Sequence, residues 1–264
     1  MVAPAGEAVS MADRWPLSPE KVATAREGSV EPDHGLSPEI RSIEGCKTAG
    51  MLLESPDDLR TMYRQPRGGA VNKVVDRLDQ HCLDFLAASP LLVLSTADGD
   101  GRCDGSPKGG EPGFARALDE HRVAWADSSG NNRLDSFENI VRNPNVAALF
   151  LVPGLDETFR INGTAELSTD PELCSQFELG GRPAKVVCVV TVREAYLHCA
   201  KALRRASIWE PATWPSDGDR PDAMCMLRDH ARIDVETEAL REGYSADVEA
   251  TLWKPGGGNV EQVE

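Results

Sequence analysis

Apolar residues recur at helical or strand spacing through the middle of the chain, and this pattern predicts most of its elements. Between residues 71 and 86 the spacing predicts one amphipathic helix that ends at Ser89-Pro90. The run LLVLSTA predicts a buried strand, and the turn sequence DGDG at 98–101 predicts a hairpin whose return strand is RCDGSPK. A Gly/Pro loop, GGEPG, then precedes a further strand, RVAWAD.

The second half of the chain continues the same alternation of strands and short helices. A helix is predicted over 134–142, then an apolar strand, VAALFLV, and a strictly alternating strand over 158–168. The sequence TDPE at 169–172 reads as a capping box for a helix through Phe177. KVVCVVTV predicts the next strand, and AYLHCAKAL a helix after it. Short strands joined by hairpins predict a mainly β fold, an antiparallel barrel with peripheral helices.

Composition divides the chain into three parts. Residues 1–43 are rich in Pro, Gly, Ser and Glu without periodicity, which predicts a disordered extension. Met11 and Met51 are further candidate translation starts. Residues 44–254 form the predicted domain, and the Gly-rich residues 255–264 a predicted flexible tail.

Charge and cysteine content narrow the function classes. The net charge is −15, from 43 acidic and 28 basic residues, which disfavours general binding to nucleic acid or anionic membranes. No apolar leader or membrane-spanning run is present, so we expect a cytoplasmic protein. The seven cysteines are scattered without a CxxC pair, and Cys188 and Cys199 are expected to be reduced thiols in the core.

The candidate chemistry lies between Asp104 and Asn145. Ser106 and Lys108 end one strand, just before two glycines. Asn131, Asn132 and Arg133 directly precede the helix predicted from Leu134, and helix N-termini attract phosphate groups. The alternative is that an asparagine only caps the helix and that Arg133 is solvated.

Two further features have alternative interpretations. Trp125 is either a core aromatic, which its residue type favours, or a residue whose backbone and ring edge meet a heteroaromatic cofactor. Lys201, Arg204 and Arg205, followed by Trp209, form either a solvated helix face or a site for an anionic ligand. No hydrolase, zinc-protease, P-loop or Rossmann motif and no metal-ligand spacing occurs in the sequence.

Long segments resemble the pyridoxamine 5′-phosphate oxidase-like family, in its branch of FMN-binding proteins of largely unassigned function. SPLLVLSTADGDGRCDGSPKGGEPGF and ADSSGNNRLDSFENIVRNPNVAALFLVPGLDETFRINGTAELSTDPEL carry the resemblance, which extends over about residues 44–254. It implies a split β-barrel that forms a homodimer with FMN at the subunit interface. By motif position it implies these cofactor-binding residues: Ser106, Lys108, Trp125, Ala126, Asn131, Asn132, Arg133 and, from the partner subunit, Lys201 and Trp209.

Two departures from the family pattern matter, one for the cofactor phosphate and one for the substrate. Lys108 and Gly110 stand where this branch has an arginine and an acidic residue. The Arg-x-His-type substrate segment of true pyridoxamine phosphate oxidases is replaced by EATLWKP, so vitamin B6 oxidation is not expected.

The leading hypothesis is an FMN-dependent oxidoreductase that transfers hydride at flavin N5 to or from an unknown small molecule, with NADH or NADPH as possible donors. The alternatives are a non-catalytic flavin-binding or flavin-sequestering protein, and a relative that uses deazaflavin or haem. The sequence identifies no catalytic side chain, substrate or electron acceptor.

Overall fold

A computed structural model describes residues 52–256, and the chain divides into two compact units between Tyr63 and Arg64. The first unit contains α2 (Pro56–Met62), which opens with a reciprocal capping box between Ser55 and Asp58. The predicted extension 1–43, the domain start at 44, both alternative starts and residues 257–264 lie outside the described residues.

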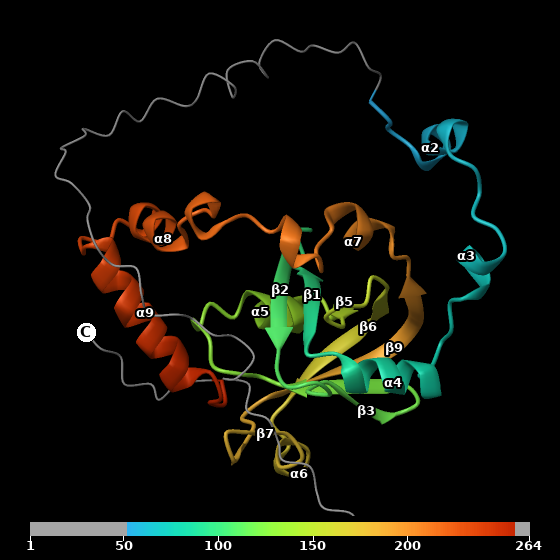
Figure 1. The fold of residues 1–264 in the computed structure, drawn as a ribbon. Coiled ribbons are helices and arrows are strands. Elements are labelled where there is room, and N and C mark those ends of the chain that lie inside the picture. Colours follow the sequence, from blue (N-terminus) through green and yellow to red (C-terminus); the bar gives the residue numbers. More distant parts are fainter. Residues whose placement is uncertain (1–51, 257–264) are drawn as a thin grey trace, which may run out of the picture. The chain divides into compact units, whose positions relative to one another are not determined.

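The second unit is a mainly antiparallel sheet with short helices around it (Figure 1). Its helices and strands, in chain order, are α3 (Gly69–Asn72), α4 (Gln80–Ala88), β1 (Leu91–Ala97), β2 (Cys103–Gly109), β3 (Arg116–Asp119), β4 (Arg122–Ala126), α5 (Asp135–Arg142), β5 (Asn145–Leu151), β6 (Thr158–Ser168), α6 (Pro171–Cys174), β7 (Glu178–Leu179), β8 (Arg182–Pro183), β9 (Val187–His198), α7 (Lys201–Ala206), η3 (Pro211–Thr213), η4 (Asp217–Asp219), α8 (Ala223–Ala231) and α9 (Thr237–Thr251). No helix of the described part has the length and apolarity needed to cross a membrane.

The strand order β2-β1-β5-β6-β9-β4-β3 explains the sequence patterns of the individual strands. β6 alternates between buried and partly exposed positions, as predicted, because only one of its faces meets the core. The first four residues of β9 are all buried, because both faces of this central strand are covered. The sheet curls into the split β-barrel that the sequence predicts, and the edge strands β2 and β3 do not pair with each other.

The predicted helix over 71–86 is wrong as a single element. Val75 instead pairs with Ala195 through two backbone hydrogen bonds of 3.0 and 2.8 Å. A new helix, α4, begins after Asp79, whose side chain accepts from the backbone N–H of Cys82. The helical spacing is therefore shared by two short helices and a bridge to β9, a long-range contact that no local pattern reveals.

The predicted helix AYLHCAKAL is also wrong in its first half. Residues up to His198 continue β9, because they pair with β6 as far as Thr158, and α7 begins only at Lys201. The capping residue of α6 is Asp170 and the helix ends at Cys174, which is shorter than predicted. Cys188 is buried as predicted, whereas Cys199 is exposed, because it lies beyond the paired end of β9.

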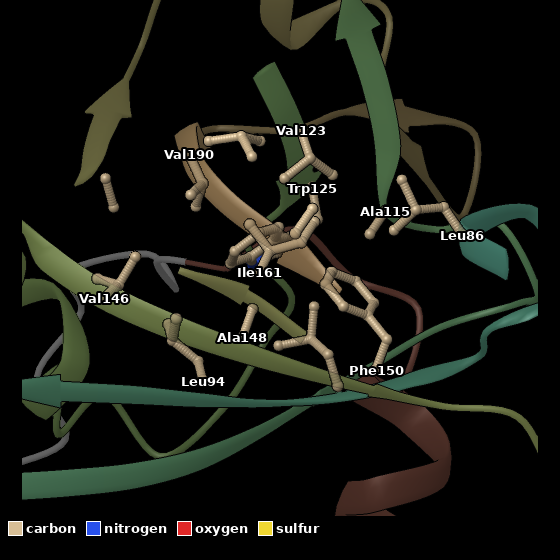
Figure 2. Close-up of a cluster of buried hydrophobic side chains, with 14 of the residues drawn as sticks. Leu86, Leu94, Ala115, Val123, Trp125, Val146, Ala148, Phe150, Ile161 and Val190 are labelled. Carbon is tan, nitrogen blue, oxygen red and sulfur yellow. The ribbon is translucent and has the colours of Figure 1, made fainter. Parts of the chain in front are cut away.

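The main core lies on the inner face of the sheet. Trp125 is only 1% exposed, and its ring lies among Val123, Phe150 and Ile161 (Figure 2). The core interpretation of its side chain is therefore confirmed. A smaller core on the other side of β4 and β9 is built around Phe177 and Val187.

Candidate functional site

The end of β2, the segment after β4 and the turn before α5 enclose a cavity of about 250 Å³. Its lining comes from 104–108, from Asp127 and Ser128, and from 130–137. The structure thus brings together five predicted residues from separate stretches of sequence: Ser106, Lys108, Asn131, Asn132 and Arg133.

The N-terminus of α5 faces this cavity without a side-chain cap. The first amide that bonds within the helix is that of Glu138, which donates to the Leu134 carbonyl oxygen at 2.9 Å. The amides of the preceding turn have no acceptor inside the helix, as at every helix start. The alternative that Asn131 or Asn132 caps the helix is wrong, because Asn131 Oδ1 instead accepts from the Arg133 amide at 3.1 Å.

Two residues of the turn adopt the left-handed backbone conformation. Asn132 has φ 56° and Leu134 has φ 59°, although neither is glycine. For Leu134 this conformation costs about 1–2 kcal/mol. A left-handed residue followed by a helical one turns successive N–H groups toward a common point, a geometry that binds anions. Strain of this kind is typical of binding turns.

Most charged groups around the cavity already have partners. Arg133 Nε donates to Asp135 Oδ2 at 2.8 Å, although the arginine side chain is largely exposed. Ser136 Oγ donates to Asp104 Oδ2 at 2.8 Å. Lys108 Nζ lies 5.8 Å from the Phe137 ring centroid and has no carboxylate partner within the described residues. Its charge is therefore available to a bound anion.

Asp127 adds a half-buried carboxyl to the same cavity. Burial raises the pKa of this group, and the positive charge of Lys108 opposes part of that rise. Behind it, burial raises the pKa of the Cys188 thiol to about 12, so this cysteine is a protonated core residue. Sequence reasoning missed Asp127, although it ends the predicted strand RVAWAD.

A second cavity, of about 650 Å³, adjoins the first, and Ser128 lines both. It contains Ala126 of the predicted set, the loop 109–114, and aromatic residues from three separate segments. Arg116, at the start of β3, donates to the Gln176 carbonyl oxygen and lies over the Phe177 ring, 4.4 Å from its centroid. Trp253, from the segment after α9, forms part of the wall.

Lys201 and Trp209 line neither cavity. The Trp209 indole N–H donates to the Leu155 carbonyl oxygen at 3.0 Å, and Arg204 pairs with Asp156 at 2.8 Å. Lys201 starts α7, and Arg205 Nε bonds back to its carbonyl oxygen at 3.0 Å. The role of Lys201 and Trp209 in a partner subunit's site stays a prediction, as does the backbone contact at Trp125.

The family model described as pyridoxamine 5′-phosphate oxidase matches residues 78–199, which include β1 to β9 and both walls of the first cavity. No curated protein matches the chain.

Solved structures with a similar fold include HupZ of Group A Streptococcus, at 20% identity, a TM-score of 0.38, and coverage of 46% of this chain and 93% of that one. General Stress Protein 26 of Bacillus anthracis is 16% identical, with a TM-score of 0.32 and coverage of 43% and 88%. An F420 reductase is 18% identical, with a TM-score of 0.34 and coverage of 46% and 98%. At these scores none of the three supports a function for this chain. The match over residues 78–199 assigns this part of the chain, a split β-barrel, to the pyridoxamine 5′-phosphate oxidase-like family, which generally binds flavin.

Proposed function

We propose that this protein is an FMN-dependent oxidoreductase in which the 250 Å³ cavity holds the FMN phosphate. The observation that carries the proposal is the meeting of Lys108 and Arg133 with the uncapped start of α5 in one cavity. Among the described residues, the helix-start amides have no acceptor and Lys108 has no carboxylate partner, and together with the exposed Arg133 guanidinium they fit a phosphate dianion.

Each residue has a specific part in this arrangement. Lys108 contributes a single positive charge, and Arg133 retains donors beyond those used by Asp135. Ser106 supplies a hydroxyl to the phosphate or ribityl end, and the backbone at Ala126 orients the ring. When bound, FMN supplies hydride transfer at N5, and the protein supplies position and electrostatic environment.

Loss of the two cations tests the phosphate site. We expect Lys108→Ala and Arg133→Ala each to weaken FMN binding about tenfold or more, since hydrogen bonds to charged groups contribute about 1.5–3 kcal/mol. The double variant is expected to be colourless after gel filtration. Flavin fluorescence quenching gives the dissociation constants, and absorbance gives the bound flavin per chain.

Arg142→Ala is the matched control. This arginine lies at the far end of α5, is exposed and also pairs with a carboxylate, Glu138, at 3.0 Å. Its variant is expected to bind FMN like the parent chain. A parent protein that is colourless and takes up no added FMN contradicts the proposal, as does equal FMN binding by the parent and double variants.

Reduction kinetics separate an oxidoreductase from a flavin-sequestering protein. Stopped-flow mixing with NADH or NADPH is expected to bleach the bound flavin. A flavin that neither donor reduces favours the binding protein, and mass spectrometry of the extracted ligand distinguishes FMN from deazaflavin and haem.

A further inference from the structure

We propose that the second cavity is the substrate site and takes a planar aromatic molecule without negative charge, held against Trp253. This inference rests on the proposed FMN function and names the substrate class for that site. The cavity volume of about 650 Å³ lies within the range of small-molecule sites.

The aromatic residues of the lining favour a planar ligand with a ring of its own. Phe114, Phe177 and Trp253 come from three different segments and line the same cavity, and Trp253 is the exposed one, since Phe177 is buried beneath Arg116. Aromatic side chains contribute large contact area and prefer offset or edge-on contact with another ring. Trp253 is 46% exposed, and its indole N–H has no hydrogen-bond partner within the described residues. It therefore offers a ligand both a ring face and a donor.

The charges of the lining disfavour an anionic ligand. Glu111 and Glu178 face this cavity, and the one cation among its lining residues is Arg116. The Arg116 guanidinium is already occupied by the Gln176 carbonyl oxygen and the Phe177 ring. Unlike the first cavity, the second has no lysine and no helix N-terminus among the described residues of its lining. A phosphate or carboxylate would meet two acidic side chains and compete for one engaged arginine, so repulsion selects against it.

The Trp253 segment is fixed in place by close approaches at two glycines, one to backbone and one to a side chain. Gly180 has φ 55°, and a Cβ there would lie 2.5 Å from the Trp253 carbonyl oxygen. A Cβ at Gly256 would overlap the Asp127 carboxylate. Backbone bonds from Ser129 to the Lys254 carbonyl oxygen, at 2.9 Å, and from Gly256 to the Asp127 carbonyl oxygen, at 3.0 Å, complete the contact.

This wall lies outside the part of the chain that matches the family model. Trp253 lies outside the family match at 78–199, and the chain folds back to bring it against β7 and the end of β4. Figure 1 shows α9, in red, leading to this segment. Of the aromatic residues that line the cavity, Trp253 is therefore the one that the family match does not include.

Binding of two planar probes tests the inference on the FMN-loaded protein. Menadione is neutral, and pyridoxine 5′-phosphate is anionic. By calorimetry we expect the parent chain to bind menadione about tenfold or more tightly than pyridoxine 5′-phosphate. Trp253→Ala is expected to weaken menadione binding about fivefold or more, and Trp253→Phe to restore most of it. The double variant Glu111→Gln with Glu178→Gln is expected to gain affinity for pyridoxine 5′-phosphate.

Trp214→Ala is the control, since this exposed tryptophan lines neither cavity, and its menadione affinity is expected to match the parent. Flavin absorbance, read in the same samples, separates the two proposals. FMN-loaded protein that binds no menadione, binds it unchanged after Trp253→Ala, or prefers pyridoxine 5′-phosphate overturns the substrate class alone. A parent chain that takes up no FMN overturns the proposed function itself.

Discussion

At the scale of single residues, Asp127 is the side chain of the site whose protonation depends most directly on its surroundings. Its carboxyl lies beside Lys108, against Gly256 and in front of the buried Cys188. No neighbour donates a hydrogen bond to it within the described residues. Its pKa is raised mainly by burial, so the folded protein holds this proton to a higher pH than the unfolded chain does.

Asp127→Asn is expected to stabilise the protein more at neutral pH than near pH 4. The folded state binds more protons than the unfolded state once the pH passes the unfolded value of 3.8, so the carboxyl lowers stability as the pH rises through its raised folded pKa. Urea midpoints at both pH values measure the difference between the variant and the parent. Asp247→Asn, which removes an exposed carboxyl on α9, is the control. A variant effect of equal size at both pH values contradicts the burial argument.

The candidate site was predictable wherever its chemistry is local in sequence. Ser106, Lys108 and the turn Asn131–Arg133 share one cavity. They could be predicted because short sequence motifs mark both the end of the hairpin and the start of the helix. Asp127, Arg116 and Trp253 were not found. An aspartate at the end of a strand is common in turns and on surfaces, so Asp127 carried no specific signal. Trp253 reaches the site only because the chain folds back after α9.

At the scale of elements, β9 contains a bulge at Arg193, and a glycine of β6 lies opposite it. The register between β6 and β9 shifts at Asn162 and Gly163, and a Cβ at Gly163 would overlap the Thr191 carbonyl oxygen. The bulge lets β9 bend and still pair with β6 on both sides of the bend. The close approach of two backbones at this point leaves no room for a side chain.

Gly163→Ala is expected to lower the free energy of unfolding by about 1–3 kcal/mol, since overpacking of a filled interior has a cost of this order. Gly105→Ala, in strand β2, meets open space and is expected to change stability little. Denaturant unfolding compares the two variants. Similar midpoints for both would show that the bulge tolerates a side chain.

Element types were predictable where partners are adjacent in sequence, and less so where they are distant. β1, β2, β5 and β6 follow from apolar runs and hairpin signals. The four-residue β3 lacks any alternation that would reveal it, and it was missed. The helix predicted over 71–86 and the helical start at AYLHCAKAL both fail at residues that pair with β6 or β9. Long-range pairing there overrides local helical spacing.

At the scale of the whole molecule, the sequence resemblance predicts a homodimer in which Lys201 and Trp209 complete the partner's FMN site. Within their own subunit both residues lie away from the two cavities. A residue that binds the ligand only across an interface is expected to lie outside the cavities of its own chain. Charge supports this arrangement, since Lys201 lies beside Arg204 and Arg205 in a chain of net charge −15.

Mixed dimers test that arrangement. A chain carrying Lys108→Ala with Arg133→Ala is co-expressed with one carrying Lys201→Ala with Trp209→Ala. In the mixed dimer, one FMN site contains both pairs of substitutions and the other contains neither. We therefore expect about one FMN per mixed dimer, and little FMN in dimers of either variant alone. Sedimentation gives the oligomeric state and absorbance the flavin content. A mixed dimer without flavin contradicts completion of the site across subunits.

The strand order has a consequence for how the chain assembles. β1–β2, β3–β4 and β5–β6 are pairs of consecutive strands, whereas β9 comes last in the chain and lies between β6 and β4. Until β9 is inserted, β4 and β6 each keep an unpaired edge. Pairing at long sequence separation slows folding and leaves such edges open to other chains. The strand synthesised last among those described, β9, is thus a central strand of the sheet. It joins β2-β1-β5-β6 to β4-β3, and the barrel forms only when it is in place.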